Sequence, residues 1–214
     1  MNAVPRQPLS RQRILDAALQ VGDEHGLEAI SMRRVAKQLG VEAMSLYNHV
    51  PNKAAMVAGM LEHVFGSITV PPRDAPWPDR LRALGLSMHR ELAAHPVAVT
   101  LIVTDRAAPR HRAALQPIEE MFAALHDAGL DAARAAVTAE AFTALIFGTV
   151  LLRPARQTTS QADRDELEWF RHTVTANDFP HLHNAFGAAG TAAGIGYQLE
   201  LLITGIQVQA KRLA

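Results

Sequence analysis

The chain has 214 residues, and its 21 lysines and arginines balance 21 aspartates and glutamates, so its formal net charge is zero. This balance argues against a protein that binds nucleic acid through bulk electrostatics alone, and the absence of cysteine excludes disulfide bonds and thiolate metal sites. Hydrophobic residues make up 49% of the chain and aromatic residues only 5%, and alanine, a strong helix former, is abundant, so we expect an all-α fold.

The first residues predict an arm followed by a helix. Residues 1–9 contain two prolines, and this segment is either an arm whose Arg6 contacts a DNA backbone or an ordinary solvated tail. Ser10 can cap a helix that ends near Gly26, with Ile14 on its apolar stripe.

A second and a third helix follow in close succession. Ser31 can cap a helix that begins at Met32, and Gly40 stands where a helix turns left-handed to stop. A short helix can then run from about Glu42 until Pro51 forbids its continuation. Two helices joined by a tight glycine turn form the helix-turn-helix pattern.

The short helix has the side chains that reading DNA requires. Leu46 can anchor it from below, and small or hydrogen-bonding residues occupy its outer face, namely Ala43, Ser45, Tyr47 and His49. Asn52 can cap the next helix, which places Lys53 beside free backbone N–H groups as a phosphate site. The same pattern also fits a plain structural corner in which the Tyr47 ring is half-buried.

A fourth helix, to about residue 65, joins this unit to the remainder of the chain. Four prolines between residues 71 and 78 then break regular structure. We therefore predict a DNA-binding domain in residues 1–53, a connecting helix in residues 54–70, and a second domain in residues 71–214.

The second domain is predicted to be a series of helices. We expect helices after Pro78, around residues 115–125, from Asp131 to about residue 153, over 166–175 and over 191–213, with a short apolar piece at 97–104, a loop at 156–165 and no clear period at 177–190. The helix after Asp131 and the last helix are apolar over most of their circumference, which indicates either a monomeric core or a subunit interface. The predicted interface residues are Leu145, Gly148, Leu199, Leu202 and Ile206.

Three stretches of the chain resemble the tetracycline-repressor (TetR) family of bacterial regulators: residues 14–18 (ILDAA), the pattern R-x-V-A-x-x-L-G-V from Arg33, and S-L-Y-x-H-V-x-N-K from Ser45. The resemblance implies a three-helix DNA-binding domain, a larger helical ligand-binding domain, and a dimer that meets in a four-helix bundle. By residue match it places Arg33, Ser45, Tyr47 and His49 on the operator and Lys53 on the DNA backbone. Glu42, Ala43 and Met44 occupy the most variable base-reading positions, so no operator sequence follows.

The same resemblance implies a ligand pocket. Residues that suit an apolar or aromatic ligand are Met60, Met88, Val103, Met121, Phe142 and Phe147, although a plain core would contain the same residue types. The founding member of the family binds a magnesium-chelated drug through a histidine on a short central helix. Residues 97–104 contain no histidine, which argues against tetracycline and magnesium here.

The function predicted from these features is a cytoplasmic, homodimeric repressor without cofactor, which a small molecule releases from a palindromic operator. The alternative is a helical ligand- or partner-binding protein that no longer reads specific DNA. An enzyme has no residues to support it, since the chain lacks a phosphate loop and a nucleophile elbow, and His181 and His183 lack a third metal ligand. No uninterrupted apolar run approaches the roughly twenty residues of a membrane span.

Overall fold

A computed structural model of the chain describes residues 8–105, 112–152, 161–188 and 194–211, and every regular element in these ranges is helical, which confirms the all-α prediction. In chain order the helices are α1 (Arg11–His25), the 3-10 turn η1 (Leu27–Ala29), α2 (Met32–Leu39), α3 (Ala43–Tyr47), α4 (Lys53–Gly66), α5 (Trp77–Ala94), α6 (Pro96–Asp105), α7 (Arg112–Asp127), α8 (Ala132–Leu152), α9 (Gln161–Thr173), α10 (Pro180–Ala188) and α11 (Gly194–Lys211).

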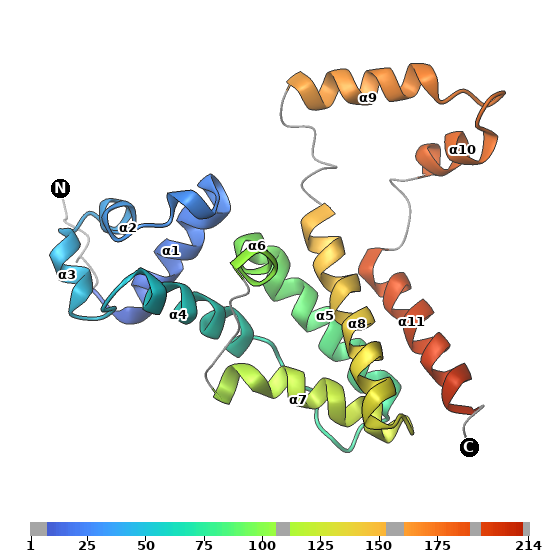
Figure 1. The fold of residues 1–214 in the computed structure, drawn as a ribbon, viewed down its shortest axis with the longest axis horizontal. Helices are drawn as coiled ribbons and strands as arrows, with labels where there is room; N and C mark the ends of the chain where they lie inside the picture. Colours follow the sequence, from blue (N-terminus) through green and yellow to red (C-terminus); the bar gives the residue numbers. More distant parts are fainter. Residues whose placement is uncertain (1–7, 106–111, 153–160, 189–193, 212–214) are drawn as a thin grey trace, which may run out of the picture.

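The helices form two parts that α4 connects (Figure 1). The first part, at the left of the view, contains α1, α2 and α3, and the larger part contains α5 to α8 and α11. α4 contacts α1 on one side and α7 on the other, so a single helix belongs to both parts. α9 and α10 lie beyond the end at which α8 stops and α11 begins. The domain boundaries at residues 53 and 70 stay a prediction.

The N-terminal helices begin and end where the sequence predicts. The side-chain oxygens of Ser10, Ser31 and Asn52 each accept a hydrogen bond from the backbone N–H three residues further on, at 3.3, 3.2 and 2.8 Å. Each therefore satisfies an amide that the helix itself leaves unpaired. Gly40 follows α2 with φ 67° and ψ 35°, the left-handed conformation that glycine adopts without a steric cost.

The second domain departs from its predicted elements in three places. Residues 97–104 belong to the helix α6, whose first turn is stabilised because the Asp23 carboxylate accepts the Val97 N–H at 2.9 Å. The stretch without a clear period contains α10, and α9 begins at Gln161, inside the predicted loop. Polar composition had suggested a loop for that segment, but charged and polar residues also form exposed helices.

Candidate nucleic-acid interface

The turn between α2 and α3 fixes the orientation of the short helix. The Val41 N–H bonds the carbonyl of Ala36 at 3.0 Å across the Gly40 turn, which closes the end of α2. Leu46 has no exposed surface and Val50 has 1%, so both anchor α3 and its C-terminal turn in the core of the first domain. One side of α3 is thus held down, and the opposite side faces outward.

The predicted DNA-contacting residues lie on this outward side or at its ends. Met44 is 72% exposed and Tyr47 45% exposed, while Ala43 and Ser45 are half-buried. Glu42 and His49, before and after α3, are exposed. With somewhat more than half of its surface covered, the exposed Tyr47 fits both a DNA contact and a ring packed against a structural corner.

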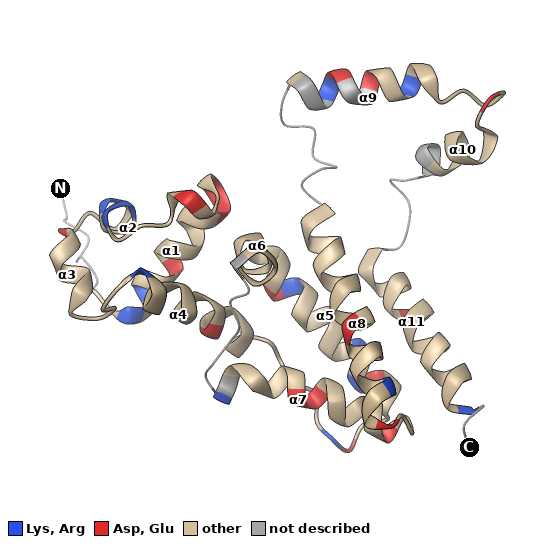
Figure 2. Ribbon diagram, viewed as in Figure 1, with Lys and Arg blue, Asp and Glu red and all other residues tan. Residues whose placement is uncertain are grey.

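Positive charge flanks α3 rather than occupying it (Figure 2). Arg33, Arg34 and Lys37 are exposed on α2, and Lys53 is exposed in the first turn of α4. None of these four cations forms an ion pair with another residue in the described ranges. Exposed, unpaired cations beside a recognition helix are what phosphate contacts require.

Two of these cations were missing from the predicted site. Arg34 and Lys37 lie on the side of α2 that Val35 and Ala36 leave to solvent, since the latter two are almost completely buried. Their spacing of three residues on an amphipathic helix was the signal in the sequence that would have found them.

A carboxylate couples the first domain to α6. The Asp23 oxygens accept the Val97 N–H and face Nδ1 of His95, each at 2.9 Å. α1 and α6 approach closely here, because a Cβ placed on Gly22 would lie 2.7 Å from Cγ2 of Val97. Together with α4, this junction gives the DNA-contacting unit two direct contacts with the second domain.

The predicted ligand-binding residues come together only in part. Met60, Met88, Met121 and Phe142, from α4, α5, α7 and α8, are buried in one hydrophobic core, and Phe147 is partly buried beside it. Val103 is 56% exposed and lies outside this core, so its place in a ligand pocket stays a prediction. Its helix turns Ala98 and Leu101 inward, and Val103 consequently faces away.

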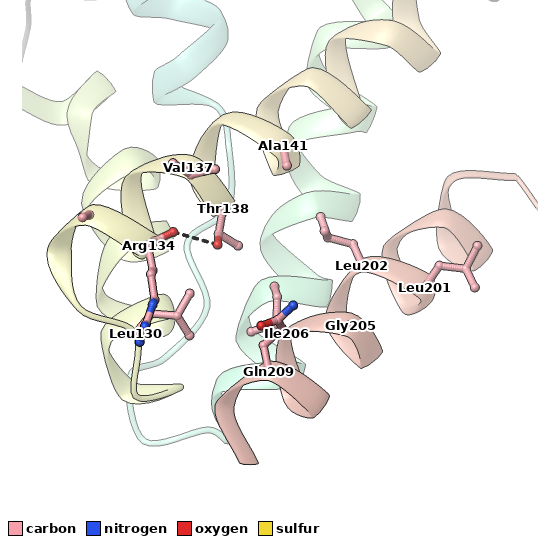
Figure 3. A pocket seen from close by; sticks show the side chains of 11 residues that line it. Leu130, Arg134, Val137, Thr138, Ala141, Leu201, Leu202, Gly205, Ile206 and Gln209 are labelled. Carbon is pink, nitrogen blue, oxygen red and sulfur yellow. Dashed lines mark hydrogen bonds between the residues drawn. The ribbon is translucent and has the colours of Figure 1, made fainter. Parts of the chain in front are cut away.

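An open groove of about 630 Å³ lies between α8 and α11 (Figure 3). Its walls are mostly apolar, with a hydrogen bond of 2.8 Å from the Thr138 hydroxyl to the Arg134 carbonyl on one side. The lining residues are Leu130, Ala133, Arg134, Val137, Thr138, Ala141, Leu201, Leu202, Gly205, Ile206 and Gln209.

The predicted interface residues divide between this surface and the interior. Leu145, Gly148 and Leu202 are partly buried, and Ile206 is 5% exposed but lines the groove. Leu199 has no exposed surface, so the prediction that it contacts a partner is wrong. A Cβ placed on Gly85 would lie 2.7 Å from Cδ2 of Leu199, which shows how tightly α11 packs on α5 at this point.

Other side chains of the same two helices carry the exposed apolar surface. On α8 they are Val137, Leu151 and Leu152, and on α11 they are Tyr197, Leu201 and Val208. The sequence already places the three α11 residues off the main apolar stripe of that helix. By length and composition α8 could also cross a membrane, a test that the core helices of soluble proteins pass as well.

Within the described ranges, no three His, Asp or Glu side chains lie close enough together to hold a metal ion. Of the two histidines considered as ligands, His183 instead directs Nδ1 to the Val174 carbonyl at 3.1 Å.

A short recognition helix with flanking cations, joined through one helix to a larger helical domain, defines a transcription regulator of the helix-turn-helix class. Two family models match the chain: "Bacterial regulatory proteins, tetR family" over residues 14–60 and "Tetracyclin repressor-like, C-terminal domain" over residues 70–210. The chain therefore belongs to the TetR family, as its motifs suggested.

Individual proteins agree with this assignment. An HTH-type transcriptional regulator from Saccharopolyspora erythraea is 30% identical over 183 residues, which cover 85% of this chain and 77% of that protein. The class C tetracycline repressor of Escherichia coli is 28% identical over 93% of this chain and 91% of its own. The structure of apo ActR from Streptomyces coelicolor superimposes with a TM-score of 0.73 at 25% identity, covering 97% of this chain and 99% of ActR. The complex of ActR with actinorhodin gives a TM-score of 0.70 at 26% identity, over 95% and 99%.

Proposed function

We propose that the chain is a homodimeric repressor that occupies a two-fold symmetric operator and leaves it when an apolar or aromatic small molecule binds the second domain. The observation that carries the proposal is the exposed face of α3 between the unpaired cations of α2 and α4. In this arrangement Arg33, Arg34, Lys37 and Lys53 contact phosphates and set the register, and residues 42–49 contact base edges.

The dimer in this proposal forms through α8 and α11. These helices expose six large apolar side chains and the groove between them. Soluble monomers rarely leave so much contiguous apolar surface in contact with water. A two-fold axis through this surface pairs each helix with its symmetry mate. The second chain, rather than a membrane, then covers the apolar face of α8. It also presents two copies of α3 to successive major grooves, roughly 34 Å apart. We place this DNA-bound dimer in the cytoplasm and assign it no enzymatic activity.

The effector in this proposal enters the core formed by α4, α5, α7 and α8. Methionine side chains adapt to a ligand's shape, and Met60, Met88 and Met121 all lie in this core beside Phe142. ActR has been crystallised in complex with actinorhodin, which supports a small-molecule effector for a protein of this fold. A ligand that displaces α7 also displaces α4, because the two helices are in contact. The protein then leaves the operator if the ligand binds the displaced form more tightly. Tetracycline with magnesium is not proposed, since α6 contains no histidine.

Selection of bound sequences from a random duplex pool at about 0.1 M salt tests the proposal, because unspecific phosphate contacts favour no sequence. We expect a palindrome, bound by a species that sediments as a dimer. Recovery of unrelated sequences would overturn the DNA-reading function and favour a ligand- or partner-binding protein.

Lys53→Gln should lower the affinity for operator DNA and for random DNA by the same factor. Each lost phosphate contact lowers the slope of log affinity against log salt by about 0.9, so the dimer should lose about 1.8. Fluorescence anisotropy titrations at several salt concentrations measure this slope. Lys211→Gln, which removes an exposed lysine at the end of α11, is the matched control and should leave the slope unchanged. An equal effect of both variants would contradict a phosphate contact at Lys53.

A further inference from the structure

The recognition helix is unusual in the chemistry that it exposes. α3 contains no arginine or lysine, and Glu42 before it makes no capping hydrogen bond with its side chain. Met44 is 72% exposed, the largest fraction among the large hydrophobic side chains of the described ranges. Contacts within the described part of the chain give the Met44 side chain on α3 no packing role that would explain its exposure.

Base edges in the major groove offer few partners for such a side chain. Guanine presents the acceptors N7 and O6, which require donors such as arginine or lysine, and α3 supplies neither. The one apolar group in the groove is the C5-methyl of thymine. Ala43 is apolar but half-buried, and the exposed residues of α3 are Met44 and Tyr47. Because Tyr47 carries a hydroxyl group that suits several bases, Met44 is the exposed side chain with the narrowest choice of base partner.

We infer that Met44 reads the C5-methyl group of one thymine in each operator half-site. The inference rests on the proposed function and adds to it a base-specific contact that depends on methyl burial rather than on hydrogen bonding. Removing a single buried methyl group weakens an apolar contact by about fourfold, so removing it from both half-sites should weaken the dimer by about fifteenfold.

Replacement of thymine by deoxyuridine tests this contact, since it deletes the methyl group and leaves the pairing edge unchanged. On the selected operator, each thymine is replaced in turn, symmetrically in both half-sites, and the Kd is measured by fluorescence anisotropy. We expect one position at which the wild-type Kd rises about fifteenfold. Met44→Ala should bind the intact operator more weakly by a similar factor and should be indifferent to deoxyuridine at that position. Met44→Leu, which keeps an apolar side chain, should stay sensitive.

Leu86→Ala is the matched control, because Leu86 is also an exposed apolar residue but lies on α5. It should retain the wild-type response at every position, and the dimer mass and circular dichroism of all variants should agree. A wild type indifferent to every deoxyuridine, or a Met44→Ala variant as sensitive as the wild type, would overturn the inference while leaving the repressor function intact. If no operator is recovered, the proposed function fails and this inference fails with it.

Discussion

Leu199→Glu is expected to abolish folding, whereas Leu201→Glu, two residues further along α11, is expected to give a folded monomer. Leu199 has no exposed surface and packs where α5 passes closest, against Gly85, at which an added Cβ would also lie 3.0 Å from Cζ of Phe142. A carboxylate there loses the buried leucine contacts, about 2–5 kcal/mol, and adds a desolvation cost of several kcal/mol. The sum matches the roughly 5–15 kcal/mol that stabilises a typical domain.

Leu201 provides the matched comparison because it is 58% exposed and lines the groove between α8 and α11. A glutamate there is solvated in the monomer and becomes costly only when a second chain covers it. Circular dichroism and sedimentation velocity separate the outcomes. A folded, monomeric Leu199→Glu protein would contradict its burial, and a Leu201→Glu protein of dimer mass would contradict the proposed interface.

The contrast between these two leucines shows what could be predicted from the sequence. The helix-turn-helix is specified by local chemistry, since Ser31, Gly40 and Asn52 act on amides within three residues or on their own backbone, and each acts as predicted. The direction in which α11 faces depends instead on which helices pack against it. Because α11 is apolar over most of its circumference, its period does not distinguish the side that packs on α5 from the side left exposed.

Long-range pairs were beyond sequence reasoning for the same reason. In the sequence, Asp23 is one of several charges near the end of α1, and nothing in its surroundings indicates that it pairs with His95 and caps α6. Arg80 is likewise one arginine among others after a proline-rich stretch. Only the packing of α5 on α7 buries it.

Arg80→Met is expected to be strongly destabilising. The Arg80 guanidinium is 2% exposed, and Nε donates to Glu120, also 2% exposed, at 2.6 Å, while Nη1 donates to Asp127. Burial by itself lowers the pKa of Arg80, but these two carboxylates outweigh it and raise the pKa above its ordinary value. Removal of the arginine leaves Glu120 buried with only the exposed Arg73, whose Nε lies 3.3 Å away. Breaking a buried pair in this way costs about 3–5 kcal/mol.

For a chain of this length that loss corresponds to a Tm lower by roughly 10 °C, measured at one fixed protein concentration because a dimer's Tm depends on it. Arg82→Met is the control on the same helix. The pair of Arg82 with Glu200 lowers the pKa of that carboxylate, but the two side chains are 35% and 47% exposed, so solvent screens the pair and its loss should lower the Tm far less than the loss of Arg80. The double variant Arg80→Met/Glu120→Met should recover most of the lost stability, since it removes the stranded charge as well. Equal Tm values for Arg80→Met and Arg82→Met would show that the buried pair does not hold α5 to α7, the helix against which α4 packs.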